Sequence, residues 1–196
     1  MDYYERGEER FGFISSRLYS FVSSKAMNSF YYFIAKDIKK YGPKKILDVG
    51  SGPGDLAIML SKMKNVKVYC VDPAISMKRI AEKKFIKNKI KNIKYGLGSS
   101  RHIPFNEKFD LIITTLSFHH WEEKERSIKY LLKKLNKKGI FVIYEFCYDK
   151  LNGVQKMSIG KHSLSINEAN SYISKGYKKN VKVIDKTIKL SFTKNS

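Results

Sequence analysis

Two hydrophobic patterns alternate along most of the chain. Apolar residues from Met27 to Tyr41 recur every three or four positions and stop at Gly42 and Pro43, which predicts an amphipathic helix. Short runs rich in β-branched residues predict buried strands at residues 45–49, 66–72, 93–97, 109–116 and 140–146. Helical spacing predicts helices at residues 55–64, 76–91 and 122–136. Strands that alternate with helices are typical of an α/β fold with a mostly parallel sheet.

The last part of the chain follows a different pattern. Ser165 precedes a helical stretch and Glu168 follows three residues later, which predicts a capped helix over residues 165–175. Runs at 181–185 and 187–192 predict a terminal hairpin. Together the strands predict a Rossmann-like, mostly parallel seven-stranded sheet with helices on both faces and a C-terminal antiparallel strand.

The length of 196 residues, 42% of them hydrophobic, suits a single domain with one sizeable core. No internal repeat or low-complexity linker divides the sequence. We expect one domain, 1–196, made of an N-terminal helical segment (1–41), a central core (44–147) and a C-terminal helix with a hairpin (148–196).

The charge balance is strongly basic. Lys and Arg number 39 against 18 Asp and Glu, which gives a net charge of +21, and 33 of the basic residues are lysine. Such a field would attract nucleic acid or an acidic substrate. A lysine-biased solvated surface explains the same composition, and we favour it because arginine, the better residue for gripping phosphate, is scarce.

Two cysteines and the start of the chain narrow the class of protein further. Cys70 and Cys147 each lie in an apolar run, distant from other thiols, so we expect buried free thiols, no disulfide and no metal site. No apolar stretch is long enough for a membrane-spanning helix, and the acidic start from Met1 to Glu5 differs from a signal peptide. These features predict a cytoplasmic protein.

A glycine-rich turn from Asp48 to Gly54 leaves one predicted strand and enters the next helix. Its glycines let the backbone turn sharply and approach a ligand at the carboxyl ends of the strands. Asp55 stands where a dinucleotide fingerprint needs its third glycine, and no Gly-Lys-Ser/Thr follows. Because Asp48 would repel a pyrophosphate and hold an ammonium group, the turn indicates a cofactor with an amine and no phosphate, a description that fits S-adenosylmethionine.

Four motifs in order now carry a family resemblance, at residues 46–54, 71–77, 98–105 and 109–121. With them the sequence resembles the class I S-adenosylmethionine-dependent methyltransferases, and in particular the small single-domain group that includes the quinone-biosynthesis C-methyltransferases. The resemblance is close from residue 44 to about residue 147 and loose beyond it.

The resemblance implies a set of cofactor contacts. Asp72 would accept hydrogen bonds from both ribose hydroxyls, although the same residue could simply cap the next helix. Asp48 would bind the amino group, and the turn residues Gly50, Ser51, Gly52 and Gly54 would approach the sulfonium and methionine portion. The other cofactor-binding residues implied by the motifs are Pro73, Met77, Ser99, Ser100 and Thr115.

Some of these contacts have alternatives. Pro73 and Met77 would offer apolar surface to the adenine, or would belong to the core. Ser99 stands where the family usually has an Asp that accepts from the adenine amine, so this contact loses its charge, while the Ser100 amide would still serve the ring nitrogen. His102, in the same loop, is expected to face solvent.

The resemblance also points to the methyl acceptor. His119 and His120 end the fourth-strand motif, where an imidazole could take a proton from a phenol, enol or activated carbon. The pair could equally serve packing and loop shape. Thr115 to Phe118 stand in place of the Asn/Asp-Pro-Pro-Tyr of nucleic-acid amine methyltransferases, so an exocyclic amine is not the expected acceptor.

Three functions remain open, and the first is preferred: a small-molecule C- or O-methyltransferase, an RNA methyltransferase that uses its lysines, or a non-catalytic cofactor-binding subunit. Large aromatic residues crowd the N-terminal segment. They predict a lid over an apolar acceptor pocket, or alternatively a helix pair that covers one edge of the sheet. They include Tyr3, Tyr4, Phe11, Phe13, Tyr19, Phe21, Phe30, Tyr31, Tyr32 and Phe33.

Overall fold

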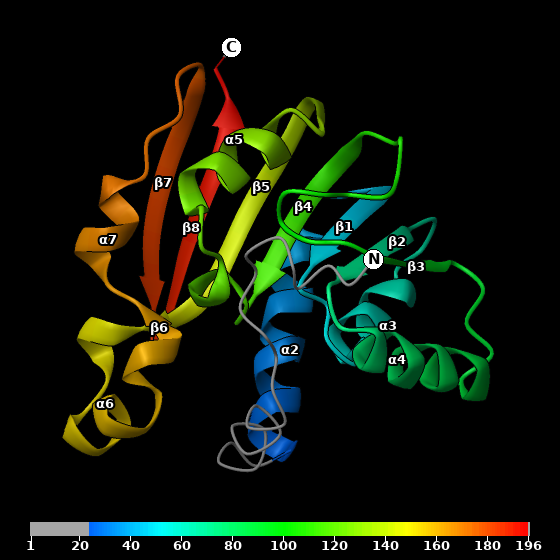
Figure 1. The fold of residues 1–196 in the computed structure, drawn as a ribbon, viewed down its shortest axis with the longest axis horizontal. Helices are drawn as coiled ribbons and strands as arrows, with labels where there is room; N and C mark the ends of the chain where they lie inside the picture. Colours follow the sequence, from blue (N-terminus) through cyan, green and yellow to red (C-terminus); the bar gives the residue numbers. More distant parts are fainter. Residues whose placement is uncertain (1–23, 196) are drawn as a thin grey trace.

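One mixed sheet organises the protein, whose computed structural model describes residues 24–195. Its main strand order is β3-β2-β1-β4-β5-β8-β7, with β6 paired to β5 (Figure 1). The strands are β1 (Lys45–Val49), β2 (Lys67–Asp72), β3 (Ile93–Leu97), β4 (Phe109–Thr115), β5 (Leu135–Cys147), β6 (Ser163–Leu164), β7 (Tyr177–Ile184) and β8 (Thr187–Lys194). Neighbouring strands pair in parallel along the order β3-β2-β1-β4-β5, and β6 pairs in parallel with β5. In contrast, β8 pairs antiparallel with β5 and with β7. The predicted fold class is confirmed, and the two-residue β6 adds an eighth strand.

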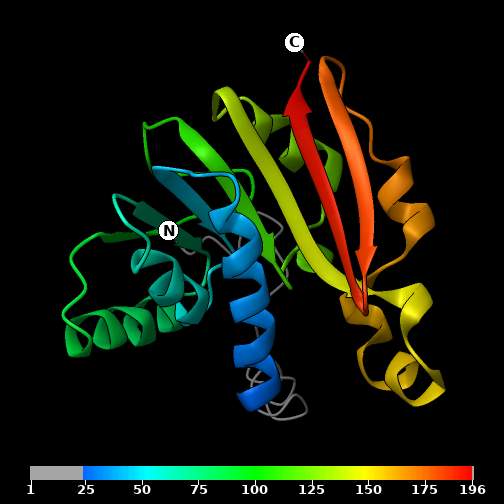
Figure 2. The same ribbon diagram turned by 180° about the vertical axis from the view of Figure 1, so that it is seen from behind.

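Helices cover both faces of the sheet. They are α2 (Ser24–Lys39), α3 (Asp55–Ser61), α4 (Ile75–Lys87), α5 (Lys124–Leu132), α6 (Gly153–Ile159) and α7 (Ile166–Ser171). Apolar residues of α2, α3 and α4 share one core cluster, and those of α5 and α7 share the other. Figures 1 and 2 accordingly show α5 in front of the sheet from one side and α2 in front from the other.

The central strands are buried on both faces, which explains why their sequences read as continuous apolar runs. In β1, Ile46 belongs to the core cluster of α2 while its neighbour Leu47 belongs to the cluster of α5. Cys70 and Cys147 are both buried free thiols, as predicted.

The helices predicted after β1 were all too long at their C-terminal ends, and those expected at 55–64 and 76–91 end at Ser61 and Lys87. The helix expected at 122–136 ends at Leu132, because Leu135 already pairs with Phe109 at the start of β5. The helix expected at 165–175 ends at Ser171. Ser165 caps it by accepting from the Glu168 amide at 3.0 Å, but the Glu168 carboxylate turns to Tyr172 and Lys124, whose side chains donate to it at 2.7 and 3.3 Å.

The sequence analysis missed α6, which begins with a capping box. The Asn152 side chain accepts from the Gln155 amide at 2.9 Å, and the Gln155 side chain accepts from the Asn152 amide at 3.2 Å. A capping box of this kind fixes where a short helix begins. The capping box therefore sets the start of α6, and the chain after α6 leads to His162 and β6.

A buried polar contact fixes α2 on the sheet. Asp37 of α2 accepts hydrogen bonds from the Tyr144 hydroxyl at 2.8 Å and from the Lys189 ammonium. Burial raises the pKa of Asp37, but the hydrogen bonds from Lys189 and Tyr144 outweigh it, so the pKa lies below its ordinary value. The last turn of α2 is thereby held against β5 and β8, while Met27 and Tyr31 nearer its start reach the carboxyl ends of the parallel strands.

Candidate active site

A cavity lies at the carboxyl ends of the parallel strands. It is bordered by Asp48 of β1, Asp72 at the end of β2, Thr115 at the end of β4 and Phe146 near the end of β5. Open α/β sheets bind their ligands in this position. Of the predicted site residues, those that line the cavity are Asp48, Gly50, Ser51, Gly52, Asp72, Met77, Thr115, His119 and His120.

Gly50 follows β1 in a turn whose geometry only glycine fits, and this turn contacts the end of β2. Its φ is +76°, and a Cβ at this position would lie 1.9 Å from the Oγ of Ser117. The amides of Gly50 and Ser51 both donate to the Val71 carbonyl, at 2.8 and 3.1 Å. The turn after β1 is thus locked between β2 and the loop that follows β4.

Gly54, a predicted cofactor residue, has a packing role in the structure. It does not line the cavity, and a Cβ there would lie 2.8 Å from the ring of Phe85. Its φ of +78° places it as the N-cap of α3. Gly54 therefore allows α3 and α4 to pack closely, and the approach to a ligand is left to Gly50 and Gly52.

Asp72 faces the cavity and organises the turn beside it. It is 3% exposed, and its two carboxylate oxygens accept from the amides of Gly52 and Ala74, both at 2.9 Å. A carboxylate offers about four lone-pair sites, so this side chain can accept from ligand hydroxyls as well as from backbone amides. The Ala74 contact belongs to a tight turn before α4, which makes Asp72 both a structural residue and a candidate ribose ligand.

Asp48 is a buried carboxyl group in the cavity wall. Burial raises its pKa to about 7, a hydrogen bond from Ser51 lowers it in part, and the nearby charge of Asp72 raises it further. A carboxyl group in this condition gains most from a cationic partner, since an ammonium group would offset both the burial and the repulsion. The geometry thus suits an amine-bearing ligand.

The predicted adenine-side residues lie outside the cavity. Ser99 accepts from the Arg101 amide at 3.2 Å, and Ser100 forms a 2.8 Å hydroxyl contact with Ser127 of α5. Neither serine is among the residues that line the cavity, nor is Pro73, so their contacts with a cofactor stay predictions. His102 is bridged to Ser99 through the backbone.

Three histidines meet at the other end of the cavity. His119 and His120 lie in a short 3-10 helix, Phe118–His120, and His162 ends another, Gly160–His162. The ring centroid of His119 lies 4.0 Å from that of His120 and 4.9 Å from that of His162. One ring nitrogen from each residue lies within 4.8 Å of the other two.

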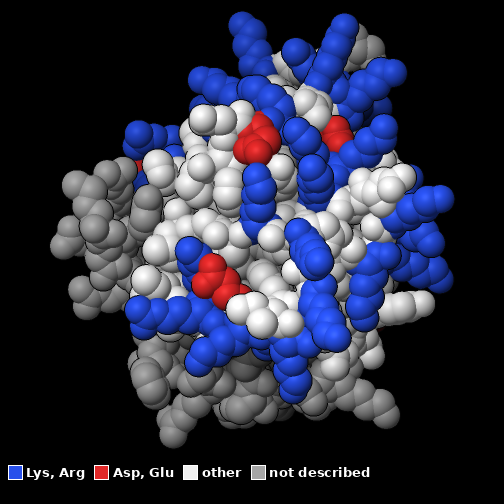
Figure 3. Space-filling view, turned by 90° about the vertical axis from the view of Figure 1, so that its right-hand side faces the viewer, with Lys and Arg blue, Asp and Glu red and all other residues white. Residues whose placement is uncertain are grey.

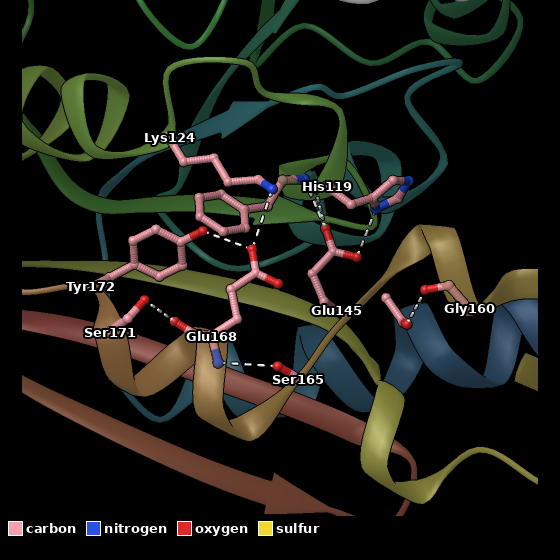
Figure 4. A network of polar contacts seen from close by, with 10 residues as sticks. His119, Lys124, Glu145, Gly160, Ser165, Glu168, Ser171 and Tyr172 are labelled. Carbon is pink, nitrogen blue, oxygen red and sulfur yellow. Dashed lines mark hydrogen bonds and ion pairs between the residues drawn. The ribbon is translucent and has the colours of Figure 1, made fainter.

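A buried carboxylate supports this cluster. Glu145 of β5 is fully buried, and its Oε2 lies 3.0 Å from the Nδ1 of His119 (Figure 4). Its Oε1 accepts from the amides of Phe118 and His119, at 2.7 and 3.3 Å. Glu145 therefore fixes both the backbone and the ring of His119, and leaves the Nε2 of that ring for another partner.

The sequence analysis did not find Glu145 or His162. Ser163 pairs with Phe146 across β6 and β5, so the residues preceding them, His162 and Glu145, come to the same place in the fold. This pairing brings the two segments together, and β6 is too short to be recognised from a hydrophobic pattern. An ionisable residue inside the apolar run of β5 was the one available signal for Glu145.

The wall beside the histidines is apolar. Phe146 stacks on Phe30 of α2 with ring centroids 5.7 Å apart, and Met27, Tyr31 and Ile159 complete this part of the lining. The predicted lid residues from Tyr3 to Phe21 lie outside the described residues. The first turns of α2 are thus the part of the N-terminal segment seen at the cavity.

The positive charge lies elsewhere on the molecule. No Lys or Arg is among the cavity-lining residues in the described part of the chain. Figure 3 shows a face crowded with Lys and Arg on the side of α3 and α4, with few acidic side chains between them. Within residues 24–195, no helix combines the length and the apolar character needed to cross a lipid bilayer.

Comparisons with known proteins agree with this fold. A sheet of this order, with a glycine turn after β1 and an acid at the end of β2, is the Rossmann-like fold that solved methyltransferase structures share. Residues 46–139, just under half of the chain, match the family model described as methyltransferase domain. The predicted resemblance is confirmed.

Curated relatives match about half of this chain. An uncharacterized methyltransferase of Staphylococcus carnosus is 35% identical over 107 residues, which are 54% of this chain and 48% of the relative. A ubiquinone/menaquinone biosynthesis C-methyltransferase of Wigglesworthia glossinidia brevipalpis is 36% identical over 108 residues, 53% of this chain and 43% of the relative. The chain spans about half the length of the curated relatives it matches.

Solved structures share the fold over nearly the whole chain. The plantazolicin methyltransferase BpumL, in complex with SAH, aligns with a TM-score of 0.76 at 14% identity, over 95% of this chain and 92% of that one. A SAM-dependent methyltransferase from Aquifex aeolicus aligns with a TM-score of 0.62 at 20% identity, over 82% and 88%.

Proposed function

We propose that this protein is an S-adenosylmethionine-dependent methyltransferase that methylates a carbon or oxygen atom of a small molecule. The observation that carries the proposal is a single cavity with two unlike ends. Two buried carboxyl groups and a glycine turn form one end, and histidines with an apolar wall form the other. The methyltransferase domain and the relatives named C-methyltransferases support the same activity.

The first end, which we call the donor end, fits the cofactor through this chain's own groups. Asp48 binds the amine, Asp72 accepts from the ribose hydroxyls, and Gly50 and Gly52 let the backbone approach the methionine portion. Met77 and Pro53 offer apolar surface beside them. When bound, S-adenosylmethionine supplies an electrophilic methyl group on a sulfonium sulfur.

The second end, the acceptor end, receives the molecule to be methylated. Met27, Tyr31, Phe146 and Ile159 exclude water and hold an apolar body, so that the nucleophilic atom faces the methyl group in line with the sulfur. His119 or His120 takes the proton that the acceptor loses, in keeping with the sequence-based assignment. The first turns of α2 border this end, and both the N-terminal lid and a cytoplasmic location stay predictions.

An RNA acceptor is less well supported, since the basic face does not extend into the cavity. A phosphate at the donor end would also meet Asp48 and Asp72. The non-catalytic alternative predicts cofactor binding without turnover, which makes it separable by experiment.

The decisive experiment has two parts. Calorimetry with S-adenosylmethionine and with its demethylated product should give stoichiometric binding, and NAD should give none. Methyl transfer from labelled donor to a cell extract, divided into small-molecule, RNA and protein fractions, should then label the small-molecule fraction. Labelling confined to RNA, or binding without any labelling, would select one of the two alternatives.

A further inference from the structure

The histidine cluster has the composition of a metal site. His119, His120 and His162 each offer one ring nitrogen, and these nitrogens lie within 4.8 Å of one another. Zinc bonds to imidazole of about 2.0–2.1 Å place tetrahedral ligands about 3.3 Å apart, so small side-chain rotations would close the set. Three imidazoles and one open position are also the ligand pattern of many catalytic zinc sites.

Glu145 supplies the outer contact that such sites use. A metal-bound histidine usually donates its second ring nitrogen to a carboxylate, which fixes its tautomer and orientation. The Glu145 carboxylate lies 3.0 Å from the Nδ1 of His119, is fully buried and also accepts two backbone amides. A carboxylate so placed aims the Nε2 of His119 at the cluster, and it balances part of the charge of a cation there.

The third histidine is held in place by its own segment. His162 lies between the 3-10 helix that it ends and the β6 pairing with β5, and the Ser163 hydroxyl donates to the Gly160 carbonyl at 2.6 Å. The Asp149 carboxylate accepts from the Ile166 amide at 2.7 Å, just beyond β6. Both sides of the cluster are therefore built on fixed backbone, as a metal site requires.

We propose that His119, His120 and His162 bind a divalent zinc ion, with Glu145 as a positioning residue and with an open coordination position toward the cavity. The inference rests on the proposed function, because the fourth ligand of the zinc ion is the molecule that the enzyme methylates. An oxygen of the acceptor, from a hydroxyl or an enol, occupies the open position next to the donor end. The cation lowers the pKa of that oxygen.

This assignment changes the role of the histidines from bases to ligands. The proton of the acceptor then leaves to solvent from an oxygen that the cation has acidified, and direct proton removal by His119 or His120 is not needed. The acceptor class narrows accordingly to molecules with an oxygen donor at or beside the methylated atom.

The test titrates untagged, chelator-treated protein with Zn²⁺, and with Co²⁺ as a spectroscopic probe. We expect one ion per chain and visible Co²⁺ absorption of a four-coordinate site. His162→Ala should weaken Zn²⁺ binding more than about 100-fold, and Glu145→Gln by about 10- to 100-fold. His102→Ala is the matched control, since His102 does not line the cavity, and it should bind Zn²⁺ as the unmodified chain does.

Measuring cofactor binding in the same variants distinguishes the metal-site proposal from the proposed function. S-adenosylmethionine binding and the melting temperature are measured on the same variants, with His162→Gln as a second substitution in case the alanine variant does not fold. Zinc lost in folded His162 variants that still bind the cofactor supports the metal site. Unchanged zinc binding in these variants, or equal loss in His102→Ala, overturns it, whereas failure of cofactor binding in the unmodified chain overturns the proposed function.

Discussion

The donor end and the acceptor end of the cavity draw on the chain in different ways. The donor end is made by backbone turns and two carboxyl groups at the ends of β1 and β2. The acceptor end is made by side chains from α2, the end of β5, the 3-10 helix with His119 and His120, and the segment around His162. One end is therefore set by local turns, and the other by how distant segments pack.

The match to known families follows the same division. Asp48, Gly50 and Asp72 lie within residues 46–139, the part that matches the methyltransferase domain model. Met27 and His162 lie outside it. We propose that donor chemistry is the shared property, and that α2 and the segment around His162 select the acceptor together with His119 and His120, which lie within the matched part.

The largest effect on stability and cofactor binding is expected at Gly50, which lies against Ser117 in the cavity wall. In Gly50→Ala, the positive φ and the clash with Ser117 should together cost about 2–4 kcal/mol of unfolding free energy and abolish cofactor binding. Gly42→Ala is the control, with a φ of +57° and nothing within 4 Å of its Cβ, so it should cost about 1 kcal/mol. Equal losses of stability for the two variants in denaturant titrations would show that Gly50 is not closely packed against Ser117.

The next effect sharpens the donor end. Asp72→Ala should weaken cofactor binding by roughly 30- to 100-fold, because a charged acceptor for ligand hydroxyls and for the Gly52 amide is removed. Ser99→Ala should weaken it only a few-fold, since the Ser99 hydroxyl bonds to the Arg101 amide outside the cavity. Calorimetric titration of both variants gives the order, and a reversed order would move the ribose contact away from Asp72.

The pH dependence of binding tests Asp48. Its folded pKa of about 7 is above the ordinary 3.8, so the native protein holds the proton more tightly than the unfolded chain. Stability should therefore fall as pH rises from about 4 to 7, and Asp48→Asn should remove this slope. An ammonium ligand favours the carboxylate, so cofactor affinity should drop by up to about tenfold per unit below pH 7.

Proton counting checks the same group independently. Near pH 7 about half of the Asp48 side chains carry a proton, so cofactor binding should release about half a proton. Calorimetry in buffers of different ionisation enthalpy measures that number, and Asp48→Asn should reduce it to near zero. Release that persists in the variant would assign the titration to another group.

The sequence predicted the donor end well because its signals are contiguous. Asp48 and Gly50 share one turn, and Asp72 ends the next strand, so strand order alone brings them together. His162 was missed because the pairing that places it beside Glu145 involves β6, which is too short to be recognised from a hydrophobic pattern. Gly54 was assigned to the ligand although it packs on Phe85, since a glycine pattern does not reveal which neighbour requires the missing side chain.

The smallest effect is expected for the basic face, which belongs to neither end. Lys83, Lys87 and Lys89 are exposed on or just after α4, whereas Lys84 bonds to the Asp55 carboxylate at 2.6 Å and should be left unchanged. Changing the three exposed lysines to Glu should leave methyl transfer to a small-molecule acceptor within a few-fold at moderate salt. The field of the surface is screened over about 10 Å there, and no lysine lines the cavity.

The outcome for RNA separates a solvated surface from a substrate-binding one. If counterion release is the whole interaction, RNA should bind weakly, without sequence preference, and should dissociate as salt rises in both the parent and the triple variant. A substrate surface would instead hold a defined RNA at physiological salt through stacking and base contacts. If the triple variant lost methyl transfer while it kept its fold and its cofactor affinity, the basic face would become the acceptor site.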